Sequence, residues 1–204
     1  MSHRVAMPRA ARLGAALGLG SVLAVVVGAS SSVGCAEPVD MDRQTVVYSP
    51  DYAVYKELVD PFLNRRCGTL DCHGQSGRGL RNYGTRGLRA AKPDGGLFPG
   101  GENTTEEEKQ FNYQSLVAVQ PEMMARVVAE GGADPDRLLL IEKALAKGCE
   151  NGRNAYLCHK GGKVLAQDDN GYRCLVAWLK TRPGSVKVAD FSAAQACKDA
   201  EAWK

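Results

Sequence analysis

The chain has 204 residues and a formal net charge of +3. Its first 34 residues hold three arginines and no acid, so the remainder balances 23 basic against 23 acidic residues. This balance offers no global basic surface for nucleic acid, and the roughly 170 residues after the leader suit a single domain.

Residues 1–34 have the three parts of a secretory signal peptide. A charged start with Arg4, Arg9 and Arg12 precedes an apolar run over residues 13–27, and small residues follow it. The run is shorter than the ~20 apolar residues of a membrane-spanning helix. Export is therefore favoured over a transmembrane anchor.

The segment Ser32-Val33-Gly34-Cys35 resembles a bacterial lipobox, with cleavage before Cys35 and lipidation of its thiol. Ser32 departs from the usual Leu of that motif. We expect a lipoprotein on the periplasmic side of a membrane, with free secretion as the alternative. Each buried CH₂ of an acyl chain contributes about 0.8 kcal/mol to such an anchor. Ala36 and Glu37 do not form an inner-membrane retention signal of the Asp-after-Cys kind, which favours the outer membrane.

A tether over residues 35–48 is expected to lead into a domain over residues 49–204. Ser49-Pro50-Asp51 predicts a helix start, with Ser49 as the cap and Pro50 at the first helical position. Apolar residues then recur at helical spacing, and Pro61 is expected to kink or split the helix before it reaches Cys67.

Cys67, Cys72 and His73 stand together in the segment Cys67-Gly68-Thr69-Leu70-Asp71-Cys72-His73-Gly74. The attachment signature for c-type haem is C-x-x-C-H, and here four residues separate the cysteines. Each thiol can add to one haem vinyl group, and Gly68 gives the longer loop freedom in φ. The segment resembles the widened C-x-x-x-x-C-H motif of some c-type cytochromes. A plain Cys67–Cys72 disulfide and a metal site are the alternatives.

The resemblance implies an all-α, cytochrome c-like helical domain with long loops around one covalently bound haem c. Cys67 and Cys72 would carry the haem, and His73 would be its proximal ligand. The resemblance covers roughly residues 50–180. It is specific at residues 67–74 and loose elsewhere.

Residues 74–101 are rich in Gly and Arg and lack a period, which predicts a long loop around the haem edge. From Arg65 to Lys92 there are seven basic residues and one acid, Asp71. One or two of these arginines are candidates to pair with the haem carboxylates, because guanidinium binds carboxylate through a planar fork. A solvated basic loop is the alternative.

Further helices are predicted along the rest of the chain. Thr104 and Glu107 form an apparent capping box, and Pro121 is expected to end that helix. Later helices are expected after Asp134-Pro135-Asp136, over residues 172–180, and after a cap at Asp190 or Ser192.

Two kinds of residue compete for the second axial position on the iron. Met123 lies 50 residues after His73 in a Pro-x-Met element like that of class I cytochromes c, although Met also fills core gaps. His159 is followed by two glycines and precedes the helix over residues 172–180, which matches the class I topology. His159 is favoured as distal ligand, with Met123 or Met124, or an open site, as alternatives.

Four cysteines remain for disulfides in an oxidising compartment. They allow three pairings, among which sequence cannot choose. We prefer one pair that braces the His159 loop and one that joins the last two helices: Cys149–Cys158 and Cys174–Cys197.

The sequence therefore predicts a lipid-anchored, mono-haem electron carrier, which it favours over an enzyme. Its expected partners are redox proteins, and the basic loop makes an acidic one a candidate. The alternatives are a haem-free, disulfide-stapled binding or scaffold lipoprotein, and a haem enzyme or sensor with an open distal site.

Overall fold

The computed structural model describes residues 47–147, 149 and 158–202. The proposed signal peptide, Cys35 and nearly all of the tether lie outside these residues, as does Gly148. Within the described part of the chain, no helix is both long enough and apolar enough to span a bilayer.

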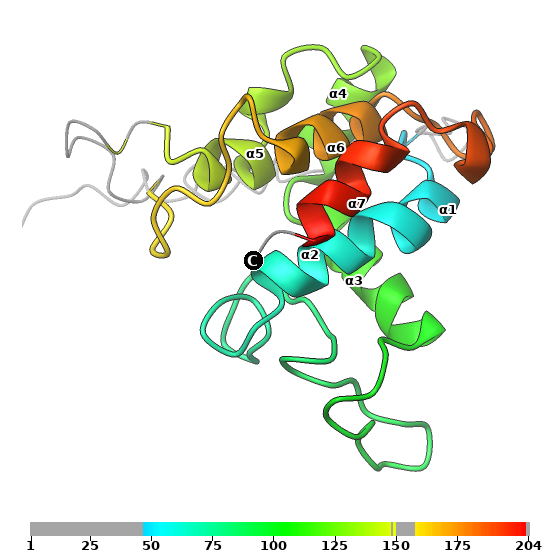
Figure 1. The fold of residues 1–204 in the computed structure, drawn as a ribbon, viewed down its shortest axis with the longest axis vertical. Helices are drawn as coiled ribbons and strands as arrows, with labels where there is room; N and C mark the ends of the chain where they lie inside the picture. Colours follow the sequence, from blue (N-terminus) through cyan, green and yellow to red (C-terminus); the bar gives the residue numbers. More distant parts are fainter. Residues whose placement is uncertain (1–46, 148, 150–157, 203–204) are drawn as a thin grey trace, which may run out of the picture. The chain divides into compact units, whose positions relative to one another are not determined.

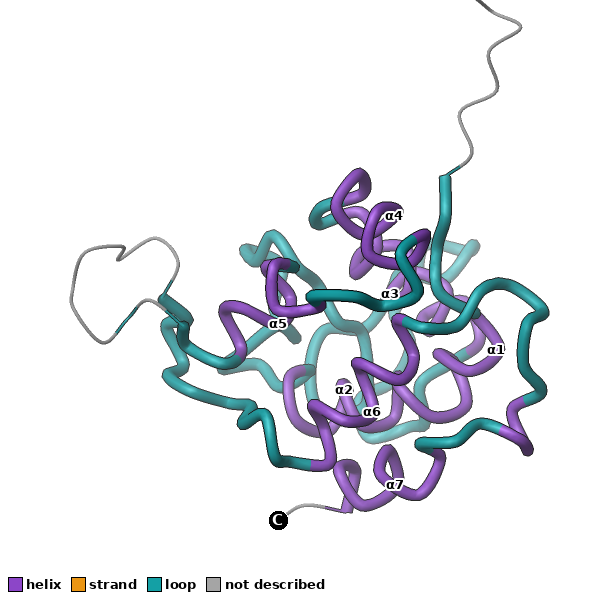
Figure 2. Tube along the Cα trace, turned by 90° about the horizontal axis from the view of Figure 1, so that it is seen from above, coloured by secondary structure: helices purple, strands orange, loops and turns teal. Residues whose placement is uncertain are grey.

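The described residues form helices joined by loops, and the all-α prediction is confirmed for them (Figures 1 and 2). Among these residues the β-structure is a single isolated bridge, between Ala91 and Leu97. The α-helices are α1 (Tyr52–Val54), α2 (Asp60–Cys67), α3 (Glu106–Ala118), α4 (Pro121–Ala129), α5 (Leu139–Ala144), α6 (Asn170–Leu179) and α7 (Ala194–Ala202). A π-helical turn, η1 (Tyr55–Val59), and two 3₁₀ turns, η2 (Pro135–Arg137) and η3 (Val188–Asp190), complete the set.

The first helical segment begins two residues later than predicted. Asp51, and not Ser49, is the N-cap, because its side chain accepts a hydrogen bond from the backbone N–H of Val54 at 2.8 Å. The same carboxylate accepts from Gly184 N–H at 2.7 Å, and Asp51 N–H donates to Thr181 Oγ1 at 3.0 Å. Contacts with a segment 130 residues away therefore select this cap.

The helix then runs through α1, η1 and α2 without a break and ends at Cys67. Pro61 occupies the first turn of α2, directly after the π-helical turn. Proline lacks an N–H and crowds the carbonyl four residues earlier, and the wider π turn relieves that conflict. The expected disturbance at Pro61 is thus a local widening, and the chain still delivers Cys67 at a helix end.

The core lies where α2, α6 and α7 pack together (Figure 2). Trp178 of α6 is fully buried, and its ring lies 5.4 Å from Tyr55 and 6.3 Å from Tyr113, centroid to centroid. A disulfide joins Cys174 of α6 to Cys197 of α7 with a Cα–Cα distance of 4.9 Å. These contacts fix the helix that ends at Cys67 against the C-terminal helices.

Helix α3 begins one residue later than predicted. The capping box is formed by Thr105 and Glu108, not by Thr104 and Glu107. Glu108 is 0% exposed and pairs with the guanidinium of Arg89. Burial of this ion pair decides the register, because the exposed Glu107 has no such partner to gain.

The prediction that Pro121 ends a helix is wrong in part. Helix α3 stops at Ala118, and Pro121 instead begins α4, a position where its missing N–H costs nothing. Helix α5 begins only at Leu139, after the 3₁₀ turn at Pro135. The last helix begins at Ala194, beyond both caps predicted for it.

Candidate functional site

A largely apolar cavity of about 520 Å³ opens between α2, the loop after it, α3, α5 and α6. Phe62, Leu116 and Leu175 are among the side chains that line it. Cavities of this size are typical of sites for small molecules and cofactors. Its wall also carries four residues singled out from the sequence: Cys67, Cys72, His73 and His159.

The segment Cys67–His73 folds as a tight loop at the end of α2. His73 N–H donates to Cys67 O at 2.8 Å, and Cys72 N–H donates to Thr69 O at 2.9 Å. These bonds close the four-residue gap, so that both cysteines and the histidine reach the same cavity despite the widened spacing.

Gly68 and Gly74 must be glycines because a side chain at either position would clash with the neighbouring backbone. Gly68 has an ordinary φ of −83°, so the freedom in φ predicted for it is not used. A Cβ at Gly68 would instead stand 2.8 Å from Asn64 O, and one at Gly74 would stand 2.8 Å from Gly87 Cα. The loop therefore packs backbone against backbone beneath the cavity.

The His73 imidazole is held in one tautomer. Its Nδ1 lies 3.0 Å from Leu80 O, and because a carbonyl only accepts, Nδ1 carries the proton. Burial, the largest influence, and the neighbouring His159 and Arg78 together lower the pKa of His73, although the Leu80 bond raises it. The ring is thus neutral near pH 7, and Nε2 keeps a lone pair for a metal.

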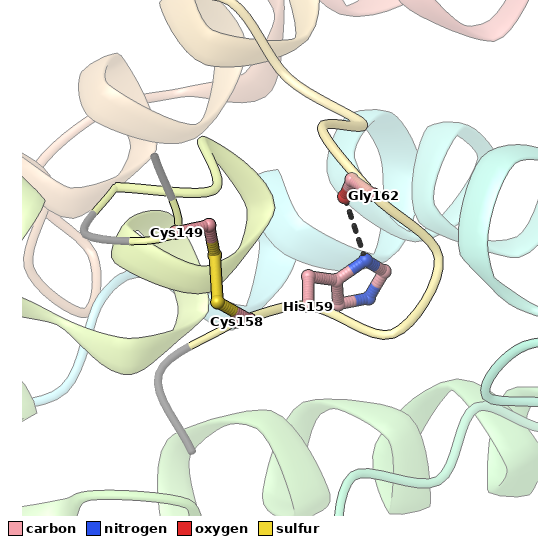
Figure 3. The surroundings of a disulfide bond; sticks show 4 residues. All are labelled: Cys149, Cys158, His159 and Gly162. Carbon is pink, nitrogen blue, oxygen red and sulfur yellow. Dashed lines mark hydrogen bonds between the residues drawn. A yellow bond between two sulfur atoms is a disulfide. The ribbon is translucent and has the colours of Figure 1, made fainter. Parts of the chain in front are cut away.

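His159 is arranged in the same way from the other side. Its Nδ1 lies 3.0 Å from Gly162 O (Figure 3), so Nδ1 donates and Nε2 keeps a free lone pair. Gly162 has φ +76°, which favours glycine, and its N–H returns to His159 O at 2.9 Å. The adjacent Cys158 forms a disulfide with Cys149, Cα–Cα 5.2 Å. The disulfide and the turn together fix the position of the imidazole.

The two imidazoles lie 5.9 Å apart between ring centroids, with their planes 30° apart. Two rings that bind one metal ion through bonds of about 2 Å place their centroids about 6 Å apart. Among the described residues no three His, Cys, Asp or Glu side chains gather as a metal site. The spacing of the two rings therefore suits two nitrogen ligands of one metal ion.

Cys67 and Cys72 are free thiols at the cavity wall, whereas the other described cysteines pair in disulfides. Burial raises the pKa of Cys67 to about 12, the nearby Arg66 opposes this, and Cys72 adds to it. The Cys67 thiol is consequently protonated at neutral pH. The two disulfides, Cys149–Cys158 and Cys174–Cys197, are the pairs preferred from the sequence.

Among the described residues, the charged side chains that line the cavity are cationic: Arg66, Arg78, Arg81 and Lys143. Arg66 contacts Asp169 at 3.3 Å. Arg78 is committed to the loop, because its Nε donates to Cys72 O at 3.1 Å. Arg81 and Lys143 leave positive charge at an apolar cavity, which suits a ligand with a large apolar body and carboxylate groups.

Several predicted residues lie elsewhere. Met124 is 2% exposed in the core of the fold, and Met123 packs against that core. Neither lines the cavity, so the structure does not bring the methionine alternative to His73. Arg89, one of the loop arginines, is buried against Glu108 instead of lining the cavity.

Sequence reasoning missed two parts of the site. The carbonyl of Leu80, which fixes the His73 tautomer, carries no residue-type signal, since any residue has a carbonyl. Lys143 comes from α5, and its approach to the cavity depends on how α5 packs. The positive charge of the Arg-rich loop was the available signal for the cationic rim.

No family model matches this chain, and no curated protein or solved structure matches it. The motif at residues 67–74 and the geometry of the cavity are what the molecule itself offers for assigning a function.

Proposed function

We propose that the chain is a mono-haem c-type cytochrome that transfers electrons. Haem c is bound covalently through Cys67 and Cys72, with His73 as proximal and His159 as distal ligand. The observation that carries the proposal is the pair of imidazoles that line one cavity, 5.9 Å apart between centroids, each with its Nδ1 3.0 Å from a backbone carbonyl oxygen. They flank a cavity that also holds two free thiols.

Haem c supplies a one-electron Fe(III)/Fe(II) couple when it is bound. Cys67 and Cys72 would each hold the haem through one thioether, in which sulfur bonds to one vinyl carbon and the thiol hydrogen goes to the other.

The remaining residues orient the group and exclude water. The Nδ1 bonds to Leu80 O and Gly162 O fix the tautomer and the orientation of the two rings. Apolar side chains from α2, α3 and α6 line the cavity. Arg81 and Lys143 are the residues we assign to the two haem carboxylates.

An electron carrier is favoured over an enzyme or sensor because His73 and His159 would each supply a nitrogen ligand to the iron. A ligand-binding haem site keeps one position open. The haem-free scaffold is less favoured because Cys67 and Cys72 stay unpaired at the cavity wall. Two imidazoles also stabilise Fe(III) more than a His/Met pair does, which predicts a comparatively low potential.

We further propose that the protein is a lipoprotein anchored through Cys35 on the periplasmic side or at the outer membrane. Cys35→Ser should move the protein from the membrane fraction to the soluble fraction. A variant that stays with membranes like the parent would refute the anchor.

Absorption spectra of protein exported together with the attachment machinery test the ligand set. The oxidised parent should be low-spin, should lack the weak near-infrared band of sulfur-ligated iron, and should not bind carbon monoxide. His159→Ala should become high-spin or water-bound and bind carbon monoxide. Met123→Ala, the matched control, should keep the parent spectrum. The opposite pair of results would transfer the ligand role to Met123.

A parent protein that binds carbon monoxide readily would favour the enzyme or sensor alternative. A parent that carries no haem at all would favour the scaffold alternative. These outcomes separate the three functions without requiring knowledge of the redox partner.

A further inference from the structure

Asp60 is a buried carboxyl, 1% exposed, at the start of α2. It accepts three hydrogen bonds: from Tyr55 Oη at 3.2 Å and Asn112 Nδ2 at 2.9 Å on Oδ1, and from Asn64 Nδ2 at 2.8 Å on Oδ2. Tyr55 and Asn112 both line the cavity assigned to haem. Asp60 is therefore connected to the wall of that cavity by two separate hydrogen bonds, one from Tyr55 and one from Asn112.

Asp60 also lines a second cavity, of about 420 Å³. Asp60 and Asn64 line it, together with polar residues of the 85–104 loop. Its other charged residues come from three elements and the loop: Arg65 of α2, Arg86, Lys109 of α3 and Glu201 of α7. Arg65, Arg86 and Glu201 are exposed, so this cavity connects Asp60 with solvent.

The environment of Asp60 favours the protonated form more than an exposed carboxyl does. Burial, the largest influence, raises its pKa, while the three hydrogen bonds and the positive charge of Lys109 lower it, and the net direction is upward. Tyr52 and Tyr55 are the other titratable groups that interact with it, and both stay neutral because burial raises their own pKa values.

Asn64 gives an independent indication that the site accepts a proton. Its Oδ1 is buried and, within the described residues, has no hydrogen-bond partner, whereas its Nδ2 donates to Asp60. Rotation of the amide by half a turn exchanges the two atoms. The amide can thus donate to an Asp60 carboxylate or accept from an Asp60 carboxylic acid, and the orphaned oxygen is the acceptor that the acid form needs.

We propose that Asp60 is a redox-linked proton site. It binds one proton, which enters through the second cavity, when the haem iron is reduced, and it releases that proton when the iron is oxidised. The inference rests on the proposed function. The electron comes from a redox partner and the proton from water, so that the added negative charge and the added positive charge compensate each other. A gain of one electron near a buried carboxylate disfavours its charged form.

The test is the midpoint potential of the haem-loaded protein, measured by spectroscopic redox titration across a range of pH. Coupling to one proton predicts a sloping segment, in which a tenfold fall in proton concentration lowers the potential by up to about 59 mV. The sloping segment should lie at pH values above the ordinary carboxyl pKa, and the potential should be independent of pH on each side of it. In Asp60→Asn, which keeps the size of the side chain, the segment should be flat.

Infrared difference spectra of the parent, reduced minus oxidised, provide a second readout that does not depend on the variant folding. They should show a protonated carboxyl band on reduction, which is lost in Asp60→Asn. Glu201→Gln is the matched control, because it removes a carboxyl at the same cavity and should keep both signals.

Equal pH dependence in the parent and in Asp60→Asn would overturn the assignment, as would a potential that does not vary with pH. A difference spectrum without a carboxyl band would do the same. A protein without haem would instead refute the proposed function, and this inference with it.

Discussion

Replacement of Glu108 by Gln should cost the fold about 3–5 kcal/mol, the usual loss when one partner of a buried ion pair is removed. Glu108 is 0% and Arg89 5% exposed at their side chains. The carboxylate accepts from Arg89 Nε at 2.8 Å and Nη2 at 2.9 Å, from Ala90 N–H at 2.9 Å and from Thr105 N–H at 3.0 Å. A Gln amide nitrogen would face two of these donors, and each buried donor left unpaired costs about 1–3 kcal/mol.

Urea unfolding of the haem-loaded protein measures this loss. With a slope of about 2 kcal/mol/M, a loss of about 4 kcal/mol lowers the midpoint by about 2 M. The matched control is Glu107→Gln, one residue earlier and exposed, which should change stability by less than about 0.5 kcal/mol. Similar midpoints for the two variants would refute both the capping register and the role of the ion pair.

Acid should remove the contribution of the Glu108 carboxylate to the stability of the fold. Burial alone would raise the pKa of Glu108, but hydrogen bonds from Arg89, Ala90 and Thr105 lower it below 4.5. A carboxyl whose pKa is lower in the folded state stabilises the fold above its unfolded-state pKa and loses that effect as the pH falls through the folded value. The gap between the parent and Glu108→Gln should therefore shrink below about pH 4.5. A gap that stays constant into acid would contradict this.

Two predictions concern the disulfides. Cys174→Ala with Cys197→Ala opens a loop of 23 residues, which should cost about 3 kcal/mol in chain entropy and lower the thermal midpoint; an unchanged midpoint would mean that the bond does not stabilise the fold. Cys149→Ser with Cys158→Ser should loosen the turn that presents His159 and produce a carbon monoxide-binding fraction that the parent lacks, and a variant with the parent's spectrum would show that the turn alone suffices.

The parts of the fold that sequence reasoning found are those with local signals. The helix that ends at Cys67 follows from apolar spacing, and the helix over residues 172–180 corresponds to α6 (Asn170–Leu179). The caps were missed by one or two residues because distant partners select them: Thr181 for Asp51, and Arg89 for Glu108.

The candidate site shows the same division. The residues Cys67, Cys72, His73 and His159, which the structure brings to one cavity, could be singled out because Cys and His carry distinctive chemistry at a distinctive spacing. The supports were not, because backbone carbonyls such as Leu80 O have no signature. The choice between His159 and Met123 was likewise a question of packing: spacing along the chain favoured Met123, and α4 carries it toward the core instead.

The mass of the tryptic peptide from Cys67 to Arg78 tests most directly whether haem is covalently attached at Cys67 and Cys72. Trypsin cleaves after Arg66 and Arg78, and the fragment between them contains both cysteines and His73. For protein exported with the haem-attachment machinery, we expect a peptide that is heavier by one haem and keeps haem absorbance under denaturing conditions. A peptide at its bare mass, or one lighter by two hydrogens because of a Cys67–Cys72 disulfide, would contradict haem attachment.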